Sequence, residues 1–213
     1  YYTVNQYKYT VEYYIDGAKD DSLTETLEAD FGSEVTSYKD KCPTGYVLEK
    51  TENLPLTITA VEAKNVIKVY YKKNTFNLTI HYVYEEDGAQ AQPDYTKDVD
   101  FGESYSVNTP TIEGYVADQN VVEGSMPAND VEVTVKYSKR SDLSYTVHYY
   151  WNGTTTSVKE DKTVGGQTYL DEITESPDNT IDGYTAVSQD SQTITIGTGT
   201  NEIIFYYYKN VEL

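Results

Sequence analysis

The side chains of this 213-residue chain that could contact a ligand are mostly aromatic. The chain holds 24 Tyr and one Trp, but only two His and one Cys. Several Tyr stand beside another aromatic residue, and neighbouring side chains of a strand face opposite sides of a sheet. One ring of each doublet should therefore face outward, where rings stack on sugars or anchor protein interfaces. The candidate ligand contacts are Tyr14, Tyr150 and Trp151; alternatively, the outward rings shield the sheet or join repeats.

The same inventory argues against an enzyme. His81 and His148 occupy the same position in two repeats, where Glu12 stands in a third. A residue on the polar face of a strand that Glu replaces in a sister copy is more simply a solvent-facing side chain than a catalytic base. No nucleophile elbow, phosphate-binding loop or dinucleotide fingerprint appears. We therefore predict neither a catalytic residue nor a cofactor.

Metal binding is the weaker interpretation of the acidic turns. Carboxylates gather at two predicted hairpins, and oxygen-rich loops can hold calcium. Neither cluster has EF-hand spacing, and the third predicted hairpin, at residues 152–156, has no carboxylate. We predict solvated charges and no metal site, and we interpret Cys42 as an unreactive thiol. The clusters are Asp16, Asp20 and Asp21, and Glu85, Glu86 and Asp87.

Four markers recur three times in the same order, which is typical of a repeat protein. An opening segment begins at Tyr9, Leu78 and Tyr145, and a closing segment begins at Asn65, Val131 and Asn201. Between them lie a glycine after an apolar residue and then a Gly-Tyr dipeptide. The first of these markers is Phe31-Gly32, Phe101-Gly102 and Val164-Gly165-Gly166, and the second is Gly45-Tyr46, Gly114-Tyr115 and Gly183-Tyr184.

These markers predict the organisation of the chain. Seven residues separate Tyr2 from Tyr9, as they separate Tyr71 from Leu78, so Tyr1 and Tyr2 resemble the end of a preceding repeat. We expect that the chain is part of a longer array. The predicted segments are a tail or linker at 1–8, repeats at 9–73, 78–139 and 145–209, linkers at 74–77 and 140–144, and a linker into a further segment at 210–213.

Each repeat should be a small, mainly β (α+β) module. The opening segments alternate between two faces and end in the turn dipeptides Asp-Gly or Asn-Gly, which predicts a hairpin. The second strands are expected at 22–31, 95–101 and 157–164, and short helices at 33–41 and 168–176. A β-grasp-like module fits this order better than a small β-sandwich, and three of them in tandem should form an elongated array. Recurring tyrosines should fill the cores: Tyr13, Tyr46, Tyr82, Tyr115, Tyr149 and Tyr184.

The net charge of −19 excludes several partners. Nucleic acid binding needs clustered Lys and Arg, and an anionic membrane would repel the chain. No apolar stretch approaches the roughly 20 residues of a spanning helix. The charge is spread over the repeats at −4, −9 and −6, which favours a soluble, monomeric segment. It should also weaken binding to sialylated or sulfated glycans.

Together the markers resemble the mucin-binding-protein repeats of Gram-positive surface proteins. Repeat two is the most similar, in Ile80-His-Tyr-Val-Tyr-Glu-Glu-Asp-Gly88, Gly102-Glu-Ser-Tyr105, Ile112-Glu-Gly-Tyr115 and Val133-Thr-Val-Lys-Tyr137. Repeat one has a longer span between Gly32 and Gly45, and repeat three lacks the acidic turn. The resemblance implies an extracellular adhesin attached to the cell wall through a region outside this chain.

The resemblance makes host mucin, or another glycoprotein, the expected partner. Each repeat would bind weakly, and many copies would raise the avidity through effective concentration. One alternative is a structural stalk that projects a separate binding domain from the wall. Another is capture of a host protein such as immunoglobulin.

Overall fold

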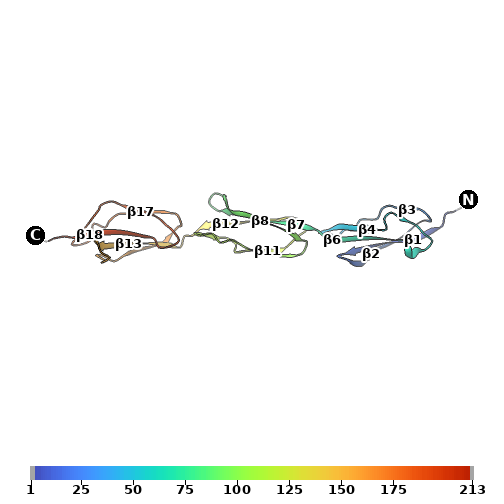
Figure 1. Cartoon of the computed structure of the whole chain (residues 1–213), viewed down its shortest axis with the longest axis horizontal. Helices are drawn as coiled ribbons and strands as arrows, with labels where there is room; N and C mark the ends of the chain where they lie inside the picture. The colour runs from blue at the N-terminus through green and yellow to red at the C-terminus, as the bar shows by residue number, and fades with distance from the viewer. Residues whose placement is uncertain (1–2, 212–213) are drawn as a thin grey trace. The chain divides into compact units, whose positions relative to one another are not determined.

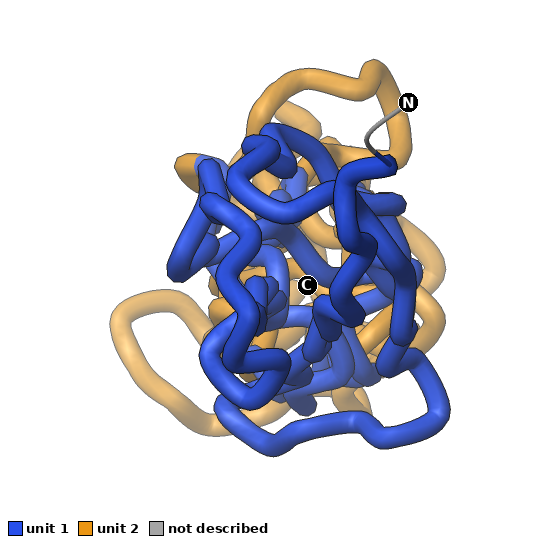
Figure 2. The backbone as a smooth tube through the Cα atoms, turned by 90° about the vertical axis from the view of Figure 1, so that its right-hand side faces the viewer, with its two compact units in different colours: residues 1–81, 94–107, 121–133 blue, residues 82–93, 108–120, 134–213 orange. Residues whose placement is uncertain are grey.

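The computed structural model describes residues 3–211, and nearly all of its regular structure is β (Figure 1). The predicted tail residues Tyr1 and Tyr2 lie outside the described part, as do the last two residues of the predicted C-terminal linker. The chain divides into two compact units (Figure 2), which run through residues 1–81, 94–107 and 121–133, and through residues 82–93, 108–120 and 134–213. The division passes through the second repeat.

The first repeat forms a four-stranded sheet in the order β2-β1-β6-β4. A two-stranded pair of β3 and β5 lies outside this sheet. The elements are β1 (Gln6–Ile15), β2 (Ala18–Asp30), β3 (Glu34–Val35), β4 (Tyr46–Glu52), β5 (Leu56–Thr57), the 3₁₀ turn η1 (Glu62–Lys64) and β6 (Val66–Lys73).

The other two repeats have the same strand order. Their sheets run β10-β12-β7-β8 and β14-β13-β18-β16, with the accessory pairs β11-β9 and β15-β17. The second repeat comprises β7 (Thr75–Tyr84), β8 (Gln90–Asp100), β9 (Ser104–Asn108), β10 (Tyr115–Ala117), β11 (Val121–Ser125) and β12 (Val131–Lys139). The third comprises β13 (Leu143–Trp151), β14 (Lys162–Gln167), β15 (Glu172–Glu175), β16 (Tyr184–Ala186), β17 (Gln192–Thr195) and β18 (Glu202–Lys209).

The closing strand lies beside the opening strand and runs parallel to it. Tyr14 pairs with Tyr70 between β1 and β6, and Tyr150 pairs with Tyr206 between β13 and β18. An opening hairpin whose first strand is flanked by a parallel final strand is the β-grasp arrangement. The predicted mainly β fold with three tandem modules is therefore confirmed.

The opening hairpin depends on backbone that few residues adopt. Asp16 and Gly17 have φ values of 49° and 81°, and Ile15 pairs with Ala18 across the turn. This is the two-residue turn that Asp-Gly favours, because its twist matches that of the flanking strands. The predicted hairpin is confirmed here, although β2 starts at Ala18 rather than at residue 22.

The two predicted helices are absent. Residues 33–41 contain β3 followed by an irregular segment, and residues 168–176 contain β15. A stretch of one or two turns cannot offset the cost of helix nucleation. Pairing of Ile173 with Ile194 on β17 supplies backbone hydrogen bonds instead.

The third repeat departs from the predicted marker and strand. β14 covers residues 162–167 instead of 157–164, so Val164-Gly165-Gly166 lies inside a strand. The backbone bonds that mark Phe101-Gly102 recur at Tyr169-Leu170: Gly102 N–H donates to Met126 O at 2.8 Å, and Leu170 N–H to Ile196 O at 2.9 Å. The sequence pattern did not reveal this marker in the third repeat, because Leu170 stands where the other repeats have Gly32 and Gly102.

Tyrosine pairs fill the cores. One ring comes from the opening strand and one from the closing strand, with centroids 6.3–6.4 Å apart in every repeat. All six are buried: Tyr13 with Tyr71, Tyr82 with Tyr137, and Tyr149 with Tyr207. The prediction that Tyr46, Tyr115 and Tyr184 belong to the core is wrong in part, because these three are only half-buried. Each of them is the first residue of its strand, in β4, β10 and β16.

The hydroxyl groups of these pairs hold the segment that crosses from the hairpin to the rest of the sheet. Tyr13 Oη donates to Lys39 O at 2.6 Å, and Tyr71 Oη donates to Asp40 Oδ1 at 2.6 Å. Tyr137 Oη donates to Pro110 O at 2.6 Å in the second repeat. Tyr207 Oη instead accepts from the Asp178 N–H at 2.8 Å in the third. A buried hydroxyl with a partner avoids the cost of an unsatisfied polar group.

A second set of aromatic contacts joins consecutive repeats. Phe101 lies on Gly45, where a Cβ would be about 2.5 Å from the ring carbons, and it meets Tyr46 edge-on with centroids 5.9 Å apart. The Asn74 N–H donates to Gly45 O at 2.9 Å, and Asn74 O accepts from the Phe101 N–H at 2.9 Å. We call this arrangement the aromatic clamp.

The aromatic clamp recurs within the second unit. Tyr169 covers Gly114, where a Cβ would overlap its ring, and meets Tyr115 edge-on at 5.7 Å. The Arg140 N–H donates to Gly114 O at 2.9 Å, and Arg140 O accepts from the Tyr169 N–H at 2.8 Å. The half-buried Tyr46 and Tyr115 of the first two Gly-Tyr markers thus contact the next repeat.

Alkaline pH should unfold the protein through its core tyrosines. Burial raises the pKa of Tyr13 to about 12, and burial also raises the pKa of Tyr137 and Tyr207. These groups stabilise the fold fully below the unfolded pKa of about 10, and the stabilisation is lost as the pH rises through the folded pKa. The free energy of unfolding should fall by up to about 1.4 kcal/mol per pH unit for each such group. Urea unfolding between about pH 9 and 12 measures this.

Tyr13→Phe provides the control for this prediction, since Phe cannot ionise. The variant should show a shallower decline of stability above about pH 10 than the parent protein. An equal decline in both proteins would show that other groups control alkaline unfolding.

Leu170 should be a site of strain. Its φ is 69°, whereas glycines occupy the equivalent positions with φ of 77°. A left-handed conformation costs a residue with a Cβ roughly 1–2 kcal/mol. Because the Leu170 side chain is 48% exposed, Leu170→Gly should raise the free energy of unfolding by about 0.5–1 kcal/mol in urea titration.

Gly102→Ala is the matched variant, since its added Cβ meets no atom within 4 Å and imposes only the backbone cost. It should destabilise the protein by about 1 kcal/mol. Destabilisation by Leu170→Gly would show that the leucine side chain contributes more than its backbone costs.

Candidate binding face

The outward face of the first sheet carries a stacked tyrosine pair. Tyr14 on β1 and Tyr70 on β6 are direct neighbours across the parallel strands, with ring centroids 4.6 Å apart and planes inclined by 21°. Both side chains are half-buried. The alternation that buries Tyr13 and Tyr71 in the core places Tyr14 and Tyr70 on the opposite side. Tyr70 was not among the predicted site residues.

Charged groups surround this pair. Tyr14 Oη donates to Glu12 Oε2 at 2.9 Å, and Tyr70 Oη donates to Glu52 Oε2 at 3.1 Å. The hydrogen bond to Glu12 raises the pKa of Tyr14, while partial burial followed by the bond to Glu52 raises that of Tyr70. Lys50 Nζ lies 4.6 Å from the Tyr70 ring centroid and 2.6 Å from Glu52. The face thus offers flat apolar rings beside hydrogen-bonding groups of both signs.

The third repeat carries the corresponding pair. Tyr150 on β13 and Tyr206 on β18 face each other with centroids 6.5 Å apart, and His148 stacks on Tyr150 at 5.3 Å and 22°. Tyr206 is 40% exposed. Burial raises the pKa of Tyr150 above its ordinary value.

The second repeat lacks such a pair. In its strands the corresponding positions hold Val83 and Lys136, and only the inward Tyr82 and Tyr137 are kept. The outward aromatic face therefore belongs to the first and third repeats.

The structure separates the predicted contact residues. Tyr14 and Tyr150 lie at equivalent outward positions, but Trp151 follows Tyr150 and pairs with the inward Tyr207. Trp151 is 49% exposed because it ends its strand, at the rim of the core side. The predicted aromatics thus do not form one patch. Tyr206 was missed because a doublet alone does not show which strand lies beside β13.

The histidines are more engaged than the sequence suggested. His148 Nδ1 lies 2.9 Å from Asp161 Oδ2, and the histidine side chain is only 14% exposed. His81 forms the same pair with Asp94 at 2.9 Å. In the first repeat Glu12 stands at this position and pairs with Lys19 at 2.8 Å. The interpretation of His148 as solvent-facing is therefore wrong; it packs under Tyr150 and links two strands.

The acidic turns engage groups of the protein. Asp16 Oδ2 accepts from Tyr46 Oη at 3.1 Å, and Asp20 Oδ1 accepts from the Ser22 N–H at 2.9 Å. Among residues 3–211, no cluster of three or more His, Cys, Asp or Glu side chains has a geometry that could hold a metal ion. We assign no metal to the hairpins.

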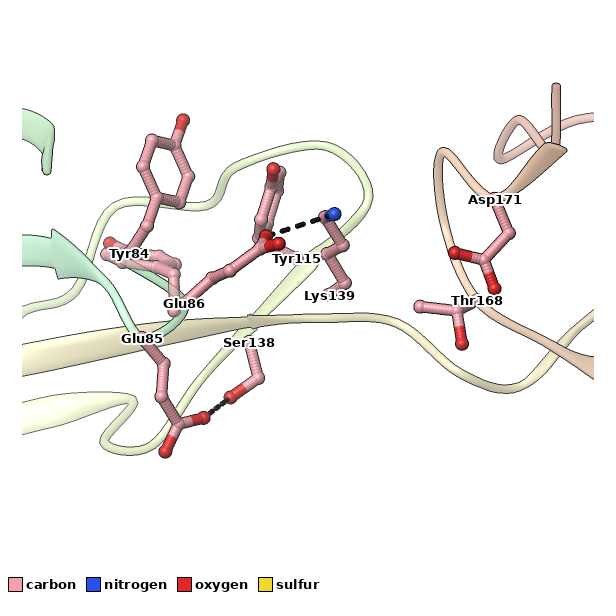
Figure 3. A pocket seen from close by; sticks show the side chains of 9 residues that line it. Tyr84, Glu85, Glu86, Tyr115, Ser138, Lys139, Thr168 and Asp171 are labelled. Carbon is pink, nitrogen blue, oxygen red and sulfur yellow. Dashed lines mark hydrogen bonds and ion pairs between the residues drawn. The ribbon is translucent and has the colours of Figure 1, made fainter. Parts of the chain in front are cut away.

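A shallow pocket of about 360 Å³ lies within the second unit (Figure 3). Its charged groups satisfy one another: Lys139 Nζ pairs with Glu86 Oε2 at 3.0 Å, and Ser138 Oγ donates to Glu85. Figure 3 shows Asp171 on the far side of the opening from these pairs. The pocket is lined by Tyr84, Glu85, Glu86, Tyr115, Tyr137, Ser138, Lys139, Thr168 and Asp171.

The described chain contains no helix with the length and apolar character needed to cross a membrane.

Solved structures show limited likeness to the chain. The structure titled Mub-RV is 17% identical, with 62% of this chain and 98% of that chain covered and a TM-score of 0.28. The type 2 repeat of the mucus binding protein MUB from Lactobacillus reuteri is 20% identical, with 62% of this chain and 99% of that chain covered and a TM-score of 0.29. The Bacillus anthracis TIE protein is 13% identical, with 94% of this chain and 50% of that chain covered and a TM-score of 0.45. No curated protein sequence matches the chain significantly.

A family match falls on the repeat that shows the sequence markers most fully. It spans the two strands of the second hairpin, the Gly114-Tyr115 marker and nearly all of β12. Residues 77–138 of this chain match the MucBP domain family.

Proposed function

We propose that the chain is a non-catalytic segment of a surface adhesin and that it binds mucin or another host glycoprotein. The MucBP match over residues 77–138 supports the class of protein. The outward aromatic pairs of the first and third repeats supply a surface suited to sugars. The stacked pair of Tyr14 and Tyr70 is the observation that carries the proposal.

Sugar recognition would combine stacking with hydrogen bonding. The apolar C–H face of a hexose packs on aromatic rings, and its hydroxyl groups bind carboxylates and amines at the edge. In the first repeat Glu12 and Glu52 accept at one edge, and Lys50 and Lys68 lie over the two rings. Because the four-carbon stem of lysine is flexible, these ammonium groups can move aside or bind an acidic sugar.

Binding at each face should be weak. The rings are half-buried and lie on an open sheet rather than in a deep cleft, so one face covers little ligand surface. Linked copies raise avidity because the second contact occurs at high effective concentration. Mucin, which carries many glycans on one chain, suits this mode.

The proposed setting is the outside of the cell, with attachment to the wall through a region outside this chain. The proposed repeats are residues 9–73, 78–139 and 145–209, although β1, β7 and β13 begin two or three residues earlier. Adjacent segments would continue the array at 1–8 and 210–213.

A spacer is the second candidate function. The aromatic clamps join consecutive repeats at Gly45 and at Gly114, and a chain of clamped modules could carry a separate binding domain. A spacer needs no ligand, so the two functions separate in a binding assay.

Removing one ring from each outward pair should weaken glycan binding. The double variant Tyr14→Ala, Tyr150→Ala loses one stacking ring on each face, at about 0.5–1.5 kcal/mol per ring. The apparent Kd for immobilised mucin should rise about tenfold or more, measured by biolayer interferometry at several surface densities. The Tyr→Phe variants at both positions keep the rings and should retain binding within about threefold.

The second repeat supplies the control for this assay. Val83→Ala removes the side chain at the corresponding position without removing a ring, and it should change the Kd less than twofold. Trp151→Ala, on the other side of the sheet, tests whether the rim also contributes. Unchanged binding in the double variant would exclude the outward pairs, and absence of binding by the parent chain would favour the spacer.

Charge should oppose binding to acidic mucin. The chain carries −19, while sialylated and sulfated glycans are anionic. Raising the ionic strength from about 0.05 to 0.3 M shortens the screening length and should tighten binding to native mucin severalfold. Enzymatic removal of sialic acid should produce the same gain at low salt. A loss of binding after desialylation would instead indicate that the lysines of the first repeat recognise sialic acid.

A further inference from the structure

The first repeat presents one half of an aromatic clamp without its other half. Phe31 occupies the position of Phe101 and Tyr169, and its N–H donates to Asn5 O at 2.8 Å as theirs do to Asn74 and Arg140. The ring of Phe31 packs edge-on against Tyr7 at 5.9 Å but is 56% exposed. Phe31 is thus an exposed ring whose backbone is held by the same hydrogen bond as those of the two sister residues that dock.

The third repeat presents the complementary half. The Asn210 N–H donates to Gly183 O at 2.8 Å, as Asn74 does to Gly45. Gly183 has φ of 73°, and a Cβ placed on it would meet nothing within 4 Å. Tyr184 follows it, half-buried like Tyr46. The glycine that is covered by a ring in two repeats is open in this one.

We propose that the surface of Phe31 and the surface of Gly183-Tyr184 are docking sites for further modules of the same type in the same polypeptide. Phe31 would pack on the Gly-Tyr turn of a preceding module. Gly183-Tyr184 would receive the aromatic ring of a following module that is joined by a short linker. The inference is independent of the ligand proposed above, because it rests only on contacts between repeats.

The linker residue explains why the partner belongs to the same chain. In both complete clamps one residue donates its N–H to the glycine carbonyl and accepts from the next aromatic N–H with its own carbonyl. Asn5 provides only the second of these bonds and Asn210 only the first. A single asparagine that joins two modules would make both, as Asn74 does. A module on a separate molecule would have its own linker residue, so no single residue could make both hydrogen bonds.

The sharpest test is a polypeptide with two copies of the chain. The first copy ends at Lys209, and the second begins at Asn5, so that one asparagine serves as both Asn210 and Asn5. The chain has only four Phe, so 4-fluorophenylalanine gives few ¹⁹F signals, and solvent isotope shifts report the exposure of each. Phe31→Leu in either copy assigns the two Phe31 signals.

One Phe31 signal, from the second copy, should lose its solvent isotope shift and approach that of Phe101. The Phe31 of the first copy has no partner and should stay exposed, which makes it the internal control. Gly183→Ala in the first copy should restore exposure in the second copy. Gly88→Ala in the first copy imposes the same backbone strain in a different repeat, since its φ is also 73° and its added Cβ meets no atom within 4 Å, and it should not restore exposure.

Two outcomes would overturn the proposal. Equal exposure of both Phe31 residues in the two-copy polypeptide would show that the surfaces do not meet. Protection of Phe31 in the single chain that grows with protein concentration would assign the surface to association between molecules instead.

Discussion

The stability of these modules depends on how the core of each sheet is covered, because an irregular segment and not a helix lies over it. A unit of about 65 residues buries little apolar surface, and here an irregular segment covers the sheet. Such a segment carries backbone groups that need partners when they approach a core. The buried tyrosines meet both needs, because their rings fill the interior and the hydroxyl groups of Tyr13, Tyr71 and Tyr137 bind the covering segment. A phenylalanine would supply the ring and leave a carbonyl such as that of Pro110 without its donor.

One pair of strands therefore serves two purposes. The inward members of the doublets, such as Tyr13 and Tyr71, hold the core and its covering segment. The outward members, Tyr14 and Tyr70, stack in the open. The second repeat keeps the inward pair and replaces the outward one by Val83 and Lys136, so the core does not require the outward rings. Since the core does not need them, the outward pairs call for a different explanation, which the proposed ligand contact would supply.

The sequence predicts the modules and their hairpins because these follow from local rules. Alternation of Val11 and Tyr13, and the Asp16-Gly17 turn, need no knowledge of distant residues. The partners of the closing strand are a matter of topology, so Tyr70 and Tyr206 could not be placed beside Tyr14 and Tyr150 from spacing alone. Helical spacing around Ile173 misled the prediction, since pairing with β17 determines that segment. Leu170 concealed the third copy of the aromatic-glycine marker, because a strained leucine breaks the pattern that glycine makes visible.

Glycine has an additional role in the Gly-Tyr marker beyond its positive φ. At Gly45 and Gly114 the missing Cβ is the space that the next aromatic ring fills, so any larger residue would separate the repeats. Gly183 keeps the positive φ although its Cβ position is empty. Asparagine can adopt this backbone conformation, and the turn alone does not require glycine at all three positions. The ring above them explains Gly45 and Gly114, and at Gly45 it also ties the spacing of the repeats to the one linker residue between Lys73 and β7.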